Sequence, residues 1–168
     1  MTTDQDLEKI AQQEKLLQFK QFDSEVAWAI GSALKTAAEK RGVAVAIDIH
    51  LNGHQLFAFA MPGTTPDNAD WIRRKRNVVE HYHHSSYAIG LTHQRAQTTL
   101  QAKTGLDPKD YAPHGGCFPI ILAGTGCVGT ITVSGLPQRD DHNLVVAVLQ
   151  DYLHLADEDL ALRAVPAC

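Results

Sequence analysis

The spacing of hydrophobic residues predicts a chain built from helices and short strands. Apolar residues recur every three or four positions over long stretches, which is typical of amphipathic helices. The predicted helices cover residues 4–18, 24–41, 68–89, 92–103 and 140–155. Asp23 and Gly42 suit the two ends of the second helix, because Asp caps helix N-termini and Gly tolerates the left-handed backbone that ends many helices.

Alternation typical of strands is clearest over residues 43–60. Two alternating runs flank Asn52-Gly53, a pair that favours a two-residue hairpin turn because both positions need a positive φ. The other predicted strands are residues 17–22, 117–123 and 127–134. Two hairpins and a first strand predict an α+β domain with an antiparallel sheet of about five strands, flanked by helices.

The register of the first hairpin predicts how its two faces are populated. We assume that Leu51 pairs with His54, as a two-residue turn requires. The isoleucines of the first strand then lie on one face, and Phe57 and Phe59 lie on the other face with Asp48. A face that carries two phenylalanines needs shielding from water, so we expect helices, a pocket or another subunit to cover it.

Composition narrows the class of protein. The 168 residues, 44% of them hydrophobic and 20% charged, suit a single domain over residues 1–168, with an N-terminal helix over 1–18 and a fraying C-terminal tail over 156–168. The net charge of −4 argues against nucleic acid as a partner, because phosphates need a basic surface. Residues 1–6 lack the features of a secretion signal, and no apolar run is long enough to span a membrane. We therefore expect a cytoplasmic protein with no membrane partner.

Lys75 is the first candidate for a binding residue. Within the predicted helix 68–89, Lys75 and Ser85 fall on the same stripe as apolar residues such as Trp71, so both are expected to face inward. A buried amine needs a partner, and an anionic ligand held by Lys75, with help from Arg74, is one possibility. In the alternative arrangement, the aliphatic part of the Lys75 side chain packs on Trp71 while its ammonium group reaches solvent.

The histidines and cysteines predict no metal site. The run His81-Tyr82-His83-His84 lacks the i, i+4 pair that helical metal sites prefer, and His114-Gly115-Gly116-Cys117 has no second ligand pair. A nucleophile at Cys117 or Cys127 has no partner that spacing can assign. His142 follows two acidic residues at a helix start, where we expect an exposed imidazole.

Several sequence motifs indicate a particular protein family. They lie in residues 45–60, 71–86, 115–120, 129–136 and 141–142. In these segments the chain resembles the haem-degrading, GlcG/HbpS-like family, specifically its small uncharacterised cytosolic branch. The resemblance implies a profilin-like α+β fold and assembly into homo-oligomers. It leaves the cofactor open, with haem or another small ligand as the candidate.

The branch motifs coincide with residues that stand out on physical grounds, and we hypothesise that they line one shared pocket. The predicted ligand-binding residues are Asp48, Arg74, Lys75, Ser85, Ser86, Gly115, Gly116 and His142. The leading hypothesis is an oligomeric domain that binds haem or a small anion. A structural or partner-binding homo-oligomer without a ligand ranks close to it. An enzyme that acts on a small metabolite through Lys75 or a histidine ranks behind, and no catalytic residue is assigned.

Overall fold

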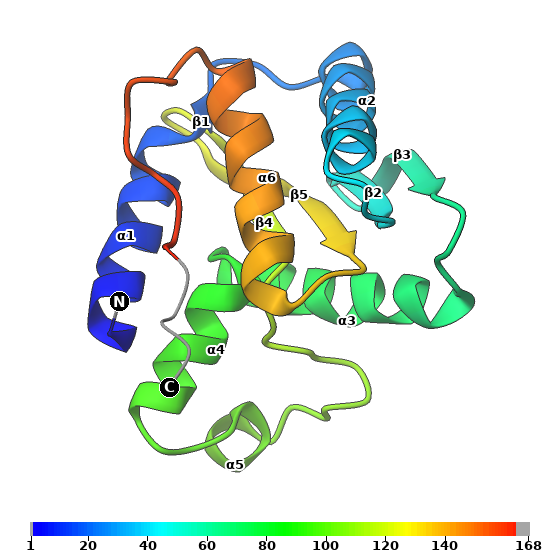
Figure 1. Ribbon diagram of the computed structural model, residues 1–168. Helices are drawn as coiled ribbons and strands as arrows, with labels where there is room; N and C mark the ends of the chain where they lie inside the picture. Colours follow the sequence, from blue (N-terminus) through cyan, green and yellow to red (C-terminus); the bar gives the residue numbers. More distant parts are fainter. Residues whose placement is uncertain (1, 164–168) are drawn as a thin grey trace.

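The computed structural model describes residues 2–163 and contains an α+β fold (Figure 1). The helices are α1 (Thr3–Leu16), α2 (Ser24–Lys40), α3 (Pro66–Tyr82), α4 (Ser86–Arg95), α5 (Leu100–Thr104) and α6 (Gln138–Tyr152). The strands are β1 (Gln18–Phe19), β2 (Ala46–Leu51), β3 (His54–Ala60), β4 (Cys117–Leu122) and β5 (Gly126–Ser134). The fold class expected from the sequence, with five strands and flanking helices, is confirmed.

The strands form one sheet in the order β1-β4-β5-β2-β3. The pairs β4–β5, β5–β2 and β2–β3 are antiparallel, whereas the short strand β1 runs parallel to β4 through Gln18 and Phe19. The sheet is therefore mixed rather than wholly antiparallel. The alternation of apolar and polar residues does not show whether a strand pairs parallel or antiparallel. For a strand as short as β1, that depends on the neighbouring strand with which it pairs in the folded chain.

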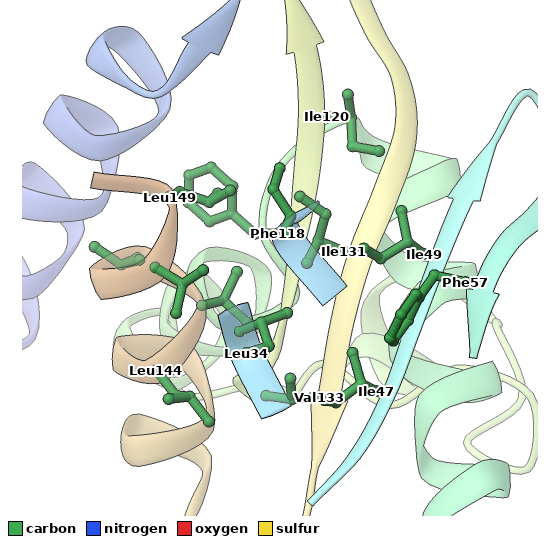
Figure 2. Packing of buried hydrophobic residues seen from close by; sticks show 14 of the residues in the cluster. Leu34, Ile47, Ile49, Phe57, Phe118, Ile120, Ile131, Val133, Leu144 and Leu149 are labelled. Carbon is green, nitrogen blue, oxygen red and sulfur yellow. The ribbon is translucent and has the colours of Figure 1, made fainter. Parts of the chain in front are cut away.

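One face of the sheet packs against α2 and α6 and forms the main hydrophobic core. In Figure 1 these two helices lie side by side, and α3 crosses the other face of the sheet. Figure 2 shows apolar side chains of the sheet, such as Ile47, Phe118 and Ile131, meeting Leu34 of α2 and Leu144 of α6. All five side chains are almost completely buried.

The predicted faces of the first hairpin are wrong for the phenylalanines. A β-bulge places an extra residue, Leu56, in β3, so Phe57 pairs with Ile49 and faces the same core. The ring of Phe57 fits there because α2 carries Gly31 opposite it, where an added Cβ would lie 2.5 Å from the ring. An extra residue in one strand moves every side chain beyond it to the opposite face of the sheet. The predicted register had no bulge, so it placed Phe57 and Phe59 on the wrong face.

The predicted helix over residues 68–89 is two helices. The first ends at His83, which adopts the left-handed conformation with φ of 58°. Ser85 then caps α4 by accepting a hydrogen bond from the Ala88 N–H. Lys75 and Ser85 are both buried, but they do not share a helical stripe. The predicted helix 92–103 is likewise divided between α4 and α5.

Part of the predicted C-terminal tail packs on the protein. Leu160 and Leu162 are buried, and Asn143 exchanges two hydrogen bonds with the backbone of Leu162. The rest of the predicted tail, residues 164–168, lies outside the described residues. Over the described part of the chain, no helix is both long and apolar enough to cross a membrane.

Candidate ligand-binding site

Lys75 is buried and forms an ion pair beneath α3. Its side chain comes off the inner face of the helix, and the residue is only 3% exposed. The ammonium Nζ lies 2.9 Å from Oδ2 of Asp141, which is in the first turn of α6, and donates a second hydrogen bond to the Val133 carbonyl. The ammonium group is therefore buried and does not reach solvent, and its partner in the folded chain is Asp141. The anionic ligand expected at Lys75 stays a prediction.

Two glycines allow the chain to pass this close to the ion pair. Gly116 has φ of +129°, and an added Cβ would lie 2.6 Å from Lys75 Nζ and 2.5 Å from the Val133 carbonyl oxygen. At Gly115 the added Cβ would lie 2.0 Å from the Gln138 carbonyl oxygen. Gly116 thus lies directly beside the Lys75 ammonium group, where no side chain would fit. Neither glycine is among the wall residues of the cavity described below, so their role in ligand binding stays a prediction.

A cavity of about 280 Å³ opens above the Lys75–Asp141 pair. Its walls include Asn68, Trp71, Lys75, His114, Gln138 and Asp141. Burial raises the pKa of the Asp141 carboxyl, while the Lys75 ammonium and the N–H groups of Leu136 and Gly135 oppose that rise. The floor of the cavity thus carries a hydrogen-bond donor and a carboxylate side by side.

His114 lies on the wall of this cavity, edge-on to Trp71 at 5.3 Å between ring centroids. Partial burial lowers the pKa of its imidazole, and the positive charges of Lys75 and Arg74 lower it further. At neutral pH the ring is therefore uncharged, so one ring nitrogen has a free lone pair.

Arg74 packs on Trp71, a wall residue of the cavity, but is not itself one of the wall residues. Its guanidinium lies 4.1 Å from the ring centroid of Trp71 and donates a hydrogen bond from Nε to Asp70 Oδ2 at 2.9 Å. Its Nη1 reaches the Pro108 carbonyl at 3.4 Å. Arg74 therefore ties α3 to the segment before β4 and adds positive charge near the cavity.

Ser85 and Ser86 support the site without lining the cavity above Lys75. Ser85 caps α4, and its N–H donates to Glu14 Oε1 of α1. The Ser86 hydroxyl donates to the His114 carbonyl at 2.5 Å and accepts from the Cys117 N–H at 3.1 Å. Ser86 thereby holds the backbone of residues 114–117 in place around the two glycines.

Asp48 belongs to a different cluster on the same face of the sheet. Its carboxylate accepts hydrogen bonds from Arg76 Nη1 at 3.1 Å and Gln55 Nε2 at 2.6 Å, and it lies 3.2 Å from His50 Nε2. None of these residues lines the cavity above Lys75. The structure does not bring Asp48 together with the other predicted residues.

His142 is buried, not exposed as its place at a helix start suggested. It is 1% exposed, and its Nε2 lies 2.8 Å from Oε1 of Gln13 in α1. Burial lowers the pKa of this imidazole to about 3, with a further contribution from Arg139. The expectation failed because α1, more than a hundred residues away in the chain, covers this part of α6.

A larger cavity, of about 510 Å³, adjoins the first one. Both cavities share His114 and Gln138 as wall residues. The larger one is formed by α4, α5 and the connection to β4, with mainly apolar walls that include Tyr87, Leu91, His93, Leu100, Leu106 and Tyr111. Sequence reasoning missed this cavity, because its walls come from segments whose packing no local spacing reveals.

Metal and thiol chemistry find little support in the described residues. Within residues 2–163, no three His, Cys, Asp or Glu side chains gather in a way that could hold a metal ion. Cys117 is completely buried, which raises the pKa of its thiol to about 12, and burial also raises the pKa of Cys127. Since the thiolate is the reactive form, neither cysteine is activated as a nucleophile.

The chain is similar to known proteins over most of its length. Residues 22–150 match the family model described as "Haem degrading protein HbpS-like". The UPF0303 protein of Serratia proteamaculans is 56% identical over 156 residues, which cover 93% of this chain and 97% of that protein. The UPF0303 protein of Azotobacter vinelandii is also 56% identical, over 162 residues that cover 96% and 98% of the two chains.

Solved structures share the fold. The crystal structure of the Ybr137w protein superposes with a TM-score of 0.82 at 32% identity, covering 90% of each chain. The HbpS crystal structure gives a TM-score of 0.62 at 23% identity, covering 81% of this chain and 92% of that one. A PduOC:heme complex gives 0.61 at 14% identity over 73% of this chain and 90% of that one, which shows a shared fold alone.

Proposed function

Because the chain belongs to the HbpS-like family of haem-degrading proteins, we propose that it is an oligomeric domain that binds a small amphipathic anion. Haem, an apolar macrocycle with carboxylate side chains, is the ligand that the family description and the PduOC:heme neighbour suggest. The observation that carries the proposal is the pair of adjoining cavities, one apolar and one with a buried ion pair at its floor.

The size and lining of the larger cavity support an apolar ligand body. Its volume of about 510 Å³ falls in the range of about 300–1,000 Å³ that is usual for small-molecule sites. Leu91 and Leu100 are buried residues of its wall, and His93 supplies an imidazole. These residues fit a haem, whose iron would add redox chemistry when it is bound.

Lys75 supports the anionic end of the ligand. A lysine ammonium has three N–H donors, and Asp141 and the Val133 carbonyl occupy two of them. The third donor is available to a carboxylate in the smaller cavity, close to the positive charge of Arg74. Gln138 adds an amide, because its Oε1 accepts from the Gly115 N–H while its amide nitrogen remains to donate.

Haemin titration, followed by the Soret absorbance, tests the proposal. The variant to compare is Lys75→Met/Asp141→Leu, which removes the donor without leaving a buried carboxylate unpaired. Loss of a hydrogen bond to a charged group, worth about 1.5–3 kcal/mol, should weaken haemin binding roughly 10- to 100-fold. Lys40→Met, an exposed lysine at the end of α2, is the matched control and should bind like the wild type.

Two results would contradict the proposal. A wild-type protein that binds neither haemin nor metal-free protoporphyrin at micromolar concentration has no site of this kind. Unchanged affinity in the double variant would remove Lys75 from the site.

Assembly into a homo-oligomer is the second part of the proposal, and it also suits the alternative of a structural protein without a ligand. Trp28 on α2 is 66% exposed, and Phe59 on the edge strand β3 is 38% exposed. Exposed edge strands and apolar patches are typical of contact surfaces. Light scattering on a sizing column should give a multiple of 18.4 kDa for the wild type and a smaller species for Trp28→Glu. A wild-type monomer would contradict this part.

A further inference from the structure

His93 on α4 presents one ring nitrogen in a defined state. Its Nδ1 lies 2.7 Å from the carbonyl oxygen of Ile89, one helical turn earlier. A carbonyl oxygen can only accept a hydrogen bond, so Nδ1 carries the proton and the lone pair of the neutral ring is on Nε2. Histidines that bind metals typically donate their other N–H to a carbonyl or carboxylate in this way. His93 is therefore oriented as a metal-binding imidazole.

His93 also lies on the wall of a cavity. His93 is part of the wall of the larger cavity, together with apolar residues such as Leu91, Leu106 and Pro108. No described residue hydrogen-bonds to its Nε2 in the folded chain, whereas Nδ1 is occupied by Ile89. The wall of this cavity is partly apolar and also carries His114 and polar residues such as Thr98 and Gln101. A histidine on the wall of such a cavity can hold haem iron.

The other buried or cavity histidines are less suited to this role. His142 is sealed against Gln13, and His50 lies between Asp48 and Arg76. His114 also lies on the wall of the larger cavity, but no described residue accepts a hydrogen bond from its ring to fix the tautomer. His114 is thus the internal comparison for His93.

We propose that His93 Nε2 is the iron ligand of a haem whose macrocycle occupies the larger cavity. This assignment rests on the proposed function and adds to it the residue that contacts the metal. It also places the macrocycle between α4, α5 and the connection to β4, with the anionic side chains toward Lys75.

Spectra of the haemin complexes test the assignment, with His93→Ala, His114→Ala and His54→Ala compared with the wild type. His54 is exposed at the hairpin turn and serves as the control. We expect His93→Ala alone to lose the absorption bands and the ferrous iron–histidine Raman stretch of an imidazole-bound haem. Added imidazole should restore the absorption bands. Metal-free protoporphyrin, followed by fluorescence quenching, should bind His93→Ala within about threefold of the wild type, because the cavity is intact.

The outcomes separate the two proposals. If the wild type binds haemin and protoporphyrin but His93→Ala keeps the imidazole spectrum, the assignment of His93 is wrong and the binding function stands. Loss of the spectrum in His114→Ala instead of His93→Ala would likewise overturn it. If the wild type binds neither porphyrin, the proposed function fails and the assignment fails with it.

Discussion

The two faces of the central sheet are built from the same strands but differ in chemistry. Toward α2 and α6, β5 presents Ile131 and Val133, and toward α3 it presents Thr130 and Thr132. All four side chains are completely buried. The apolar face therefore gains stability from removing hydrocarbon from water, whereas each buried group of the polar face needs a hydrogen-bond partner. Thr132 has one in Cys117 Sγ, but the Thr130 hydroxyl has none among the described residues.

This difference indicates where function is to be sought. A buried ion pair such as Lys75–Asp141 gives little or no net stability compared with an apolar pair of similar volume, because desolvation offsets the attraction. The α3 face also supports the smaller cavity, while the α2–α6 face is close-packed. Under the proposed function, the α3 face would serve ligand binding, whereas the α2–α6 face serves folding.

Removal of one partner of the ion pair should have the largest effect on stability. Lys75→Met leaves the Asp141 carboxylate buried without its ammonium and should lower the free energy of unfolding by about 3–5 kcal/mol. Lys75→Met/Asp141→Leu should recover most of that loss. Urea denaturation followed by circular dichroism measures both variants. Equal destabilisation of the single and the double variant would contradict the weak net contribution of the pair.

A pair of neighbouring residues on β5 tests the contrast between the faces directly. Ile131→Ala opens a hole in the apolar core and should lower the free energy of unfolding by about 2–5 kcal/mol. Thr132→Ala removes a hydroxyl that donates to Cys117 Sγ at 3.0 Å and should lower it by about 0.5–1.5 kcal/mol. Urea denaturation followed by circular dichroism measures the free energy of unfolding of both variants. A larger loss for Thr132→Ala would reverse the roles that we assign to the two faces.

The buried imidazole of His142 should make stability depend on pH. Its pKa is about 3 in the folded chain and about 6.5 when unfolded, so between these values only the unfolded chain binds the proton. Stability is therefore complete above about pH 6.5 and falls with decreasing pH by up to about 1.4 kcal/mol per pH unit.

The variant His142→Gln isolates this contribution. Glutamine does not titrate, and its amide can still donate to Gln13 Oε1. Between pH 7 and pH 4.5 the wild type should lose about 2–3 kcal/mol more than the variant, measured from urea midpoints. Parallel losses in the two proteins would show that His142 is protonated as readily in the folded state as in the unfolded one.

Local patterns in the sequence were sufficient for much of the fold. Helical spacing located α2 and α6, and Asn52-Gly53 located the hairpin between β2 and β3. The inward position of Lys75 also followed from its stripe beside apolar residues. These predictions succeeded because a periodic pattern reports which side of an element is buried, and a turn reports its own backbone requirements.

Part of the candidate site could also be predicted from the sequence. Lys75 and Gly116, two of the residues that the motifs singled out, do lie side by side beneath α3. Asp48 does not join them, and Asp141 proved to be the partner of Lys75 through a contact that spans 66 positions of the chain. No spacing rule specifies a pair at that separation.

The sequence by itself determined the elements, the apolar core face and the inward lysine, because those depend on neighbours within a few residues. Only the tertiary structure decided the bulge that turns Phe57 into the core, the cover that α1 places over His142, and the cavity beside His93. Each of these depends on segments that meet across long sequence separations. Their positions are selected by the packing and hydrogen bonding of the whole chain, which local preference does not encode.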